Sequence, residues 1–452
     1  MRSRALIIGV LTVAGGMLLG RASGLLREMV LARVYGLTRA ADLAMFAMTL
    51  PDLLTSLLIG GAVSAVLVPE YHRQASRDGE PAARRFLGQS FTMITGLGSI
   101  LAVILAGLAP LWVELMAPGF DGADHLAALQ MARVALLAFP LSAATAVLSA
   151  VLQIHQRLTF ATLGTLAFNL TAVLVIGLFA SGHTGRTAAW AVVAGALARV
   201  VMQGIAAARD GGLNGAFSRI LRFDRLPPGI GQRYVQALAA IGLLVLLPVT
   251  ARAFASHQPG AAAAVSYALK LGELPAGICT AVISMIVLPR ISRAIQSGDS
   301  HGARTMIRTS AQLILLGLVP VIIAFQWLAD PVVGLIFRHG RLDHDAARLV
   351  ADLARVSILG VPAAVLTSLA MAGFHARQNT STPLRWGLAV FALLVPGMWL
   401  AEREWGIHGV VAATVVAAWA YTLILTVRGL SNDAMAVATP ADEDSPPSAR
   451  AA

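Results

Sequence analysis

The chain has 452 residues, of which 57% are hydrophobic and only 13% are charged, with a formal net charge of +11. Soluble domains carry roughly 25% charged residues, so a water-soluble protein of this length would lack the polar side chains to cover its surface. Apolar runs recur almost to the end of the chain, which excludes a soluble domain with a single anchor. The composition predicts an integral membrane protein.

The positive charge comes almost entirely from arginine, because Lys270 is the only lysine. A basic excess can indicate nucleic-acid binding, but these arginines lie in short loops between apolar runs, where the positive-inside rule explains them. No nucleic-acid partner is therefore expected. The apolar stretch after Met1 resembles a signal peptide but has no convincing cleavage site, and we expect it to be retained as the first helix.

A membrane-spanning helix needs about 20 mostly apolar residues, and this rule predicts about twelve helices. They are expected near 5–30, 43–69, 87–112, 127–154, 159–180, 187–207, 234–254, 262–288, 307–328, 346–373, 384–401 and 407–427. The predicted parts of the chain are an N-terminal six-helix bundle (1–210), a cytoplasmic linker (211–233), a C-terminal six-helix bundle (234–430) and a polar, disordered cytoplasmic tail (431–452).

The charges of successive loops alternate. Loops on one side are rich in arginine: Arg73, Arg77, Arg84, Arg85, Arg157, Arg209, Arg219, Arg222, Arg225, Arg233, Arg290, Arg293, Arg304, Arg377 and Arg385. The loops on the other side include an acidic one without arginine and two of mixed charge: Glu114, Asp121 and Asp124, then Asp343–Asp345, then Glu402–Glu404. The positive-inside rule then predicts that both termini are cytoplasmic.

Short patterns recur about 220 residues apart. Ala132-Arg133-Val134 followed by Pro140 recurs as Ala354-Arg355-Val356 followed by Pro362. Val68-Pro69 followed by Arg73 recurs as Leu288-Pro289 followed by Arg293. His155-x-Arg157 recurs as His375-x-Arg377. A constant spacing over three sites indicates an internal duplication. Because each half has six helices, the halves share their orientation, which predicts two parallel-repeat bundles around a central cavity.

Ionisable side chains inside membrane spans are costly unless they face a bundle interior or water, so each is a candidate for function. The first helix carries Arg21 and Arg27, and Gly20, Ser23 and Gly24 between them could allow a break. A regular helix would point the two arginines about 120° apart. Either the helix bends so that both face inward, or one arginine serves packing, for example by pairing with the adjacent acidic residue.

The eighth predicted helix carries Lys270 and Glu273, which are three residues apart and close enough to pair. This pair is either a structural staple or part of a site. Asp42 and Asp52, on the second helix, could balance the arginines. Two or three cations in a dry cavity suit a phosphate or diphosphate, which arginine binds through bidentate, charge-assisted hydrogen bonds.

Signatures of the common enzymes are absent from the sequence. It contains no G-x-x-x-x-G-K-[ST] loop, no H-E-x-x-H motif and no cluster of Cys and His. The single cysteine, Cys279, cannot form an intramolecular disulfide. We therefore expect a transporter with no enzymatic activity, no metal and no cofactor.

Several motifs resemble the MurJ (MviN) family of lipid II flippases, in order over nearly all of residues 10–430. These are Gly20–Glu28, Val34-Tyr35-Gly36, Ala41-Asp42, Leu50–Leu54, Val68-Pro69 with Tyr71, Ala117–Phe120, Tyr267–Pro275, Phe337–Gly340 and Gly373–Pro383. The resemblance implies the fold of the multidrug/oligosaccharidyl-lipid/polysaccharide exporter superfamily and alternating access. It also implies transport of undecaprenyl-diphosphate-linked peptidoglycan precursor across the bacterial inner membrane during cell-wall synthesis.

The family's cavity residues match Arg21, Arg27, Asp42, Lys270 and Glu273, which are the expected substrate-binding residues. The sequence also departs from the family pattern. Thr55 and Ser56 stand where the family has a basic pair, lysine stands at position 270 where arginine is usual, and typical members have two more helices after the twelve.

Three alternatives remain open: a flippase for another polyprenyl-diphosphate-linked glycan, a cation-coupled drug exporter, and a non-transporting scaffold for cell-wall enzymes. A drug exporter would favour acidic cavity residues, and a scaffold would need no cavity charges. Cell-wall synthesis proteins are the expected protein partners.

Overall fold

The computed structural model describes residues 2–57, 63–180, 184–209, 246–377, 379 and 381–430, and in these ranges every regular element is a helix. The predicted linker (211–233), the predicted tail (431–452) and the first part of the seventh predicted helix lie outside the described residues.

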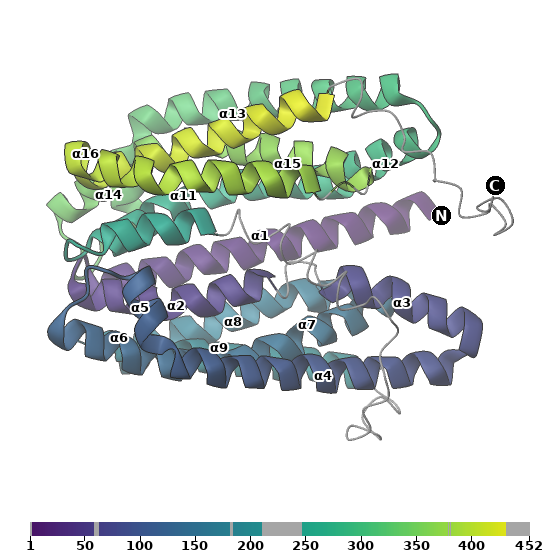
Figure 1. The fold of residues 1–452 in the computed structure, drawn as a ribbon, viewed down its shortest axis with the longest axis horizontal. Helices are drawn as coiled ribbons and strands as arrows, with labels where there is room; N and C mark the ends of the chain where they lie inside the picture. The colour runs from purple at the N-terminus through teal and green to yellow at the C-terminus, as the bar shows by residue number, and fades with distance from the viewer. Residues whose placement is uncertain are drawn as a thin grey trace, which may run out of the picture.

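Two groups of helices lie side by side, and α1 lies in the first group where it faces the second (Figure 1). The first group consists of α1 (Arg2–Tyr35), α2 (Arg39–Leu57), α3 (Val63–Asp78), α4 (Glu80–Gly107), α5 (Ala109–Met116), α6 (Gly122–Ala135), α7 (Ala138–Ile154), α8 (Leu158–Phe179) and α9 (Arg186–Arg209). The second consists of a helix at Leu246–Ala255, α11 (Ala261–Val282), the π-helical turn η2 (Ile283–Val287), α12 (Leu288–Gln296), α13 (Ser300–Phe337), α14 (His344–Ile358), α15 (Val361–Ala376) and α16 (Ser381–Leu430).

Eight segments of the described chain are long and apolar enough to cross a membrane. The last of them, Ser381–Arg428, contains the two final predicted spans, because the backbone breaks at Gly406 (φ 58°, ψ −143°). Only glycine adopts this conformation without strain. Together with α1, α2 and the helix Leu246–Ala255, these segments confirm the prediction of about twelve membrane helices in two bundles.

The internal duplication is visible in the helices that carry the first repeated pattern. In one half α6 and α7 are separated by a two-residue break, and in the other half α14 and α15 are separated in the same way. Pro140 and Pro362 lie in the first turns of α7 and α15, where proline's missing N–H has no helical partner to lose. The repeated proline therefore sets the same interruption in both bundles.

The break that the sequence suggested in the first helix does not occur, because α1 is a continuous helix of 34 residues. Its glycines instead allow close packing. An added Cβ on Gly20 would lie 3.3 Å from the Thr165 side chain of α8, and one on Gly24 would lie 3.3 Å from the Lys270 side chain of α11. Helix α1 thus packs against both bundles.

At one end of the molecule the loops 36–38, 117–121, 256–260 and 338–343 of the two bundles meet; we refer to it as the closed end. Here Arg39 donates to the Ser256 carbonyl (2.7 Å) and the Gly119 N–H donates to the Ser256 hydroxyl (2.9 Å). The Arg341 N–H donates to the Arg33 carbonyl (3.0 Å). The first helix begins, and the last described helix ends, at the opposite end (Figure 1).

Candidate functional site

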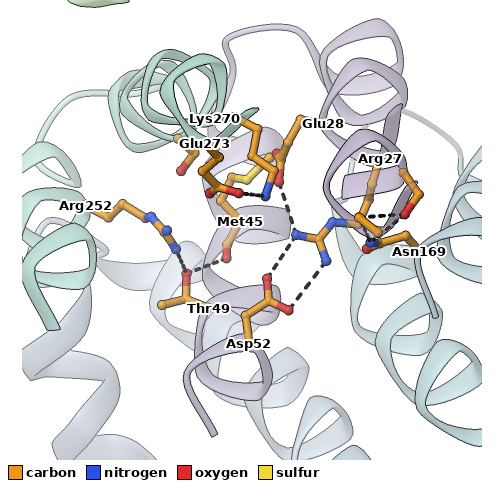
Figure 2. A network of polar contacts seen from close by, with 12 residues as sticks. Arg27, Glu28, Met45, Thr49, Asp52, Asn169, Arg252, Lys270 and Glu273 are labelled. Atoms are coloured by element: carbon orange, nitrogen blue, oxygen red, sulfur yellow. Dashed lines mark hydrogen bonds and ion pairs between the residues drawn. The ribbon is translucent and has the colours of Figure 1, made fainter. Parts of the chain in front are cut away.

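Charged side chains from α1, α2 and α11 meet where the two bundles face each other (Figure 2). Arg27 of α1 is 5% exposed and lies between two carboxylates. Its Nη2 atom is 2.9 Å from Asp52 Oδ2 of α2 and 3.2 Å from Oε1 of the adjacent Glu28. Arg27 therefore pairs with its acidic neighbour, the second of the two alternatives, and it also contacts α2 without any break in α1. Its positive charge is fully compensated.

The pair predicted on α11 is formed, with Lys270 Nζ 2.8 Å from Glu273 Oε2. Lys270 lies against Gly24 of α1, and its side chain is only 15% exposed. The side chains of Glu273 and Asp52 are 47% and 42% exposed, although both lie well inside the predicted spans. The facing bundles therefore leave accessible space at this level.

Arg21 reaches across to the second bundle. Its Nη1 atom donates to the Glu273 carbonyl (2.8 Å), and its side chain packs on Gly277 of α11. The two arginines of α1 thus point in different directions, as a regular helix requires. Arg21 joins Lys270 through Glu273, whereas Arg27 joins Asp52, so four of the five predicted site residues lie in this region.

The fifth predicted site residue, Asp42, lies elsewhere. It is fully buried at the closed end, about 15 Å from Asp52 along the same helix. Its Oδ2 atom accepts the Gly260 N–H (2.7 Å) and its Oδ1 atom accepts the Ala263 N–H (2.9 Å). Since the first N–H groups of a helix have no partner within the helix, Asp42 caps the start of α11 across the bundle interface.

Two buried arginines were not singled out from the sequence. Arg252, near the end of the helix Leu246–Ala255, donates from Nη1 to the Thr49 hydroxyl of α2 (2.7 Å). Arg199 of α9 is 5% exposed and lies beside Gly164 and Gln203 in the first bundle. Neither makes an ion pair with a described residue, and the Nε atom of each is buried without a hydrogen bond. The rule that selected Arg21, which treats an arginine within an apolar span as functional, would also have found both.

The midlevel group comprises the cations Arg21, Arg27, Arg252 and Lys270 and the carboxylates Glu28, Asp52 and Glu273. Positive charge exceeds negative charge by one, and the groups lie between apolar helices beside the accessible space at this level. Such a site favours an anion with several acceptor oxygens. Among the described residues there is no group of three His, Cys, Asp or Glu side chains that could hold a metal.

Comparisons with known proteins agree on one family. The family model described as "Lipid II flippase MurJ" matches residues 31–435. A protein of Rhizobium tropici named "Probable lipid II flippase MurJ" is 28% identical over 433 residues, which are 92% of this chain and 79% of that protein. "Lipid II flippase MurJ" of Burkholderia cenocepacia is 25% identical over 409 residues, which are 85% and 76% of the two chains.

The fold is similar to solved transporter structures. A structure titled "Lipid II flippase MurJ, inward closed conformation" superposes with a TM-score of 0.78 at 17% identity, over 92% of this chain and 87% of that chain. An inward-facing multidrug resistance transporter of the MATE family superposes with a TM-score of 0.74 at 14% identity, over 93% and 97% of the two chains.

Proposed function

Because this chain belongs to the lipid II flippase MurJ family, we propose that it moves lipid II from the cytoplasmic to the periplasmic face of the bacterial inner membrane. The observation that carries the proposal is the excess of positive charge between two bundles of this fold. A diphosphate is the anionic part of a polyprenyl-linked precursor, and buried arginine and lysine side chains compensate its charge at the bilayer midplane.

The proposed substrate-binding residues are Arg21, Arg27, Lys270 and Glu273. Glu273 holds Lys270 through its side chain and Arg21 through its carbonyl, so it orients both cations toward the accessible space. Asp42 is left out, because both of its oxygens accept hydrogen bonds from the start of α11. It belongs instead to the closed end, where it favours one conformation of the alternating-access cycle.

We further infer that the closed end is periplasmic and that both termini are cytoplasmic. The acidic residues Asp121 and Asp343 lie in loops of the closed end. The arginine-rich turn between α3 and α4, the start of α1 and the end of α16 lie at the other end (Figure 1). The positive-inside rule assigns the arginine-rich end to the cytoplasm. The conformation is then sealed on the periplasmic side, so that the site receives substrate from the cytoplasmic side.

A second candidate is a flippase for a different polyprenyl-diphosphate-linked glycan. The departure at Thr55 and Ser56, where the family has a basic pair, supports this alternative, because the site then differs from that of typical family members. A cation-coupled drug exporter fits less well, since cations outnumber carboxylates at midlevel.

The decisive experiment is replacement of the essential lipid II flippase in a depletion strain. The wild-type chain should restore growth, and the Arg21→Ala/Arg27→Ala double variant should not, because removing one member of a desolvated charge pair costs on the order of 2–5 kcal/mol. Arg355→Ala is the matched control. It removes a paired arginine that contacts Asp330 and Asp352 within one bundle.

Full growth of the double variant at matched membrane expression would refute the anion-binding site. Failure of the wild-type chain to restore growth, although it is expressed and folded, would favour the second candidate. Flipping of the other glycan lipid in reconstituted vesicles would then identify that substrate.

A further inference from the structure

Among the midlevel cations, Arg252 differs in its surroundings. Arg27 contacts two carboxylates and Lys270 contacts one, whereas Arg21 and Arg252 contact none among the described residues. Arg21 donates instead to the Glu273 carbonyl, in the residue whose carboxylate binds Lys270. Within the described part of the chain the hydrogen bond of Arg252 goes to a neutral acceptor, the Thr49 hydroxyl, which itself donates to the Met45 carbonyl (2.8 Å). Arg252 is therefore, on the side of the site that faces α2, a cation that contacts no carboxylate among the described residues.

An arginine in this state is incompletely solvated. A guanidinium has five N–H donors, and the Nε–H of Arg252 is buried without an acceptor. An uncompensated charge within a membrane span costs several kcal/mol and is retained mainly where it meets an ion or substrate. An anion entering the interface must displace Asp52 or Glu273 to reach Arg27 or Lys270, but it meets no carboxylate on Arg252.

The direction of the side chain also fits this role. Arg252 extends from the second bundle toward α2, and Arg27 extends from α1 toward the same place, with Asp52 and Thr49 between them (Figure 2). Lys270 approaches from α11 on a third side. Anionic oxygens in this space would be reached by donors from both bundles.

We propose that Arg252 binds the diphosphate of the transported lipid, taking one phosphate while Arg27 and Lys270 take the other. This inference rests on the function proposed above, and it assigns to Arg252 the preference for a diphosphate over a monophosphate. A bidentate guanidinium suits the two non-bridging oxygens of one phosphate, and lysine provides only a point charge.

A structural role for Arg252 makes a different prediction. If the hydrogen bond to Thr49 only braces the two bundles, then Thr49→Val should be as harmful as Arg252→Gln, because either change removes the bond. If Arg252 binds the anion, Thr49→Val leaves the cation in place and frees one more donor. The pair of variants separates bracing from binding.

The test measures binding of farnesyl diphosphate and farnesyl monophosphate to the purified full chain in detergent. Wild type should prefer the diphosphate. Arg252→Gln should weaken diphosphate binding about 10- to 100-fold, as expected for loss of a charge-assisted hydrogen bond, and should change monophosphate binding much less, so that the preference disappears. Thr49→Val and the control Arg355→Gln should stay within about threefold of wild type for both probes.

The outcomes are distinguishable. Three results would overturn the role of Arg252 alone. Folded Arg252→Gln could keep the diphosphate preference, or it could lose affinity equally for both probes. Thr49→Val could weaken diphosphate binding as much as Arg252→Gln does. Absence of diphosphate binding by the wild-type chain would overturn the proposed function and this inference with it. If Arg252→Gln does not fold, Arg252→Lys keeps the charge and loses the bidentate geometry. The preference of Arg252→Lys for the diphosphate over the monophosphate should fall several-fold, and an unchanged preference would refute the inference.

Discussion

Removal of the Asp42 carboxylate should open the closed end. Asp42 is fully buried, and its two oxygens accept the Gly260 and Ala263 N–H groups at 2.7 and 2.9 Å. Each buried N–H left without an acceptor costs about 1–3 kcal/mol. The cost falls on the closed arrangement, because separation of the bundles lets water reach these groups. For Asp42→Ala a cost of about 3 kcal/mol shifts the equilibrium between closed and open states about 150-fold.

This shift can be measured by cysteine labelling. Ala262 is 4% exposed and lines a small cavity that lies between Asp42 at the closed end and Thr49 and Arg252 of the midlevel site. In a Cys279→Ser background, Ala262→Cys should react slowly with an impermeant thiol reagent in intact cells, and Asp42→Ala should accelerate the reaction more than tenfold.

The matched control is Asp343→Ala. Asp343 also caps a helix at the same end, by accepting the Ala346 N–H (2.8 Å), but within a single bundle. Asp343→Ala should leave labelling of the cysteine at position 262 unchanged. Equal labelling rates in the Asp42→Ala and wild-type backgrounds, with both proteins folded, would refute the reasoning that the cap holds the bundles together.

Three further predictions follow from the charged groups and the loops. Lys270→Ala should abolish flipping and Lys270→Arg should preserve it in reconstituted vesicles; stalled transport in Lys270→Arg would show instead that the lysine must release its proton. Arg199→Gln should raise the thermal unfolding temperature in detergent, because it removes a buried charge that has no ion-pair partner among the described residues. Burial of such a charge costs at least about 1 kcal/mol of folding free energy, and a lowered unfolding temperature would contradict this account. In a Cys279→Ser background, a cysteine at Asp121 should react with an impermeant thiol reagent in intact cells and one at Ser297 should not, and the reverse pattern would invert the proposed orientation.

The fold was predictable because lipid imposes a simple rule on sequence. Each span must be long and apolar, so the run of apolar segments set the number of helices. The helix ends were less predictable. For example, α13 runs from Ser300 to Phe337, whereas the apolar segment suggested 307–328. Polar residues extend a helix into water without changing the mean apolar character of its centre, so hydropathy marks the span and not the helix.

The charge pair within one helix was predictable in full, whereas for the pairs between helices the sequence named only candidate acidic partners. The spacing of Lys270 and Glu273 places them on one face of a helix, and the structure confirms their contact. The contact of Arg27 with Asp52 and the cap formed by Asp42 depend on how α1, α2 and α11 pack. Two aspartates ten residues apart on one helix thus have different partners, and nothing in their local sequence distinguishes them.

The distribution of pairing also changes which cations are the strongest candidates for the substrate. Resemblance to a family directs attention to Arg27, whose charge is already compensated by two carboxylates. An incoming phosphate gains least where it must displace an existing anion and most where a buried donor has none. By this criterion Arg252 ranks above Arg27, and Asp52 acts as an internal competitor for the Arg27 guanidinium. A transporter must also release its cargo, and a carboxylate that returns to Arg27 would favour that release.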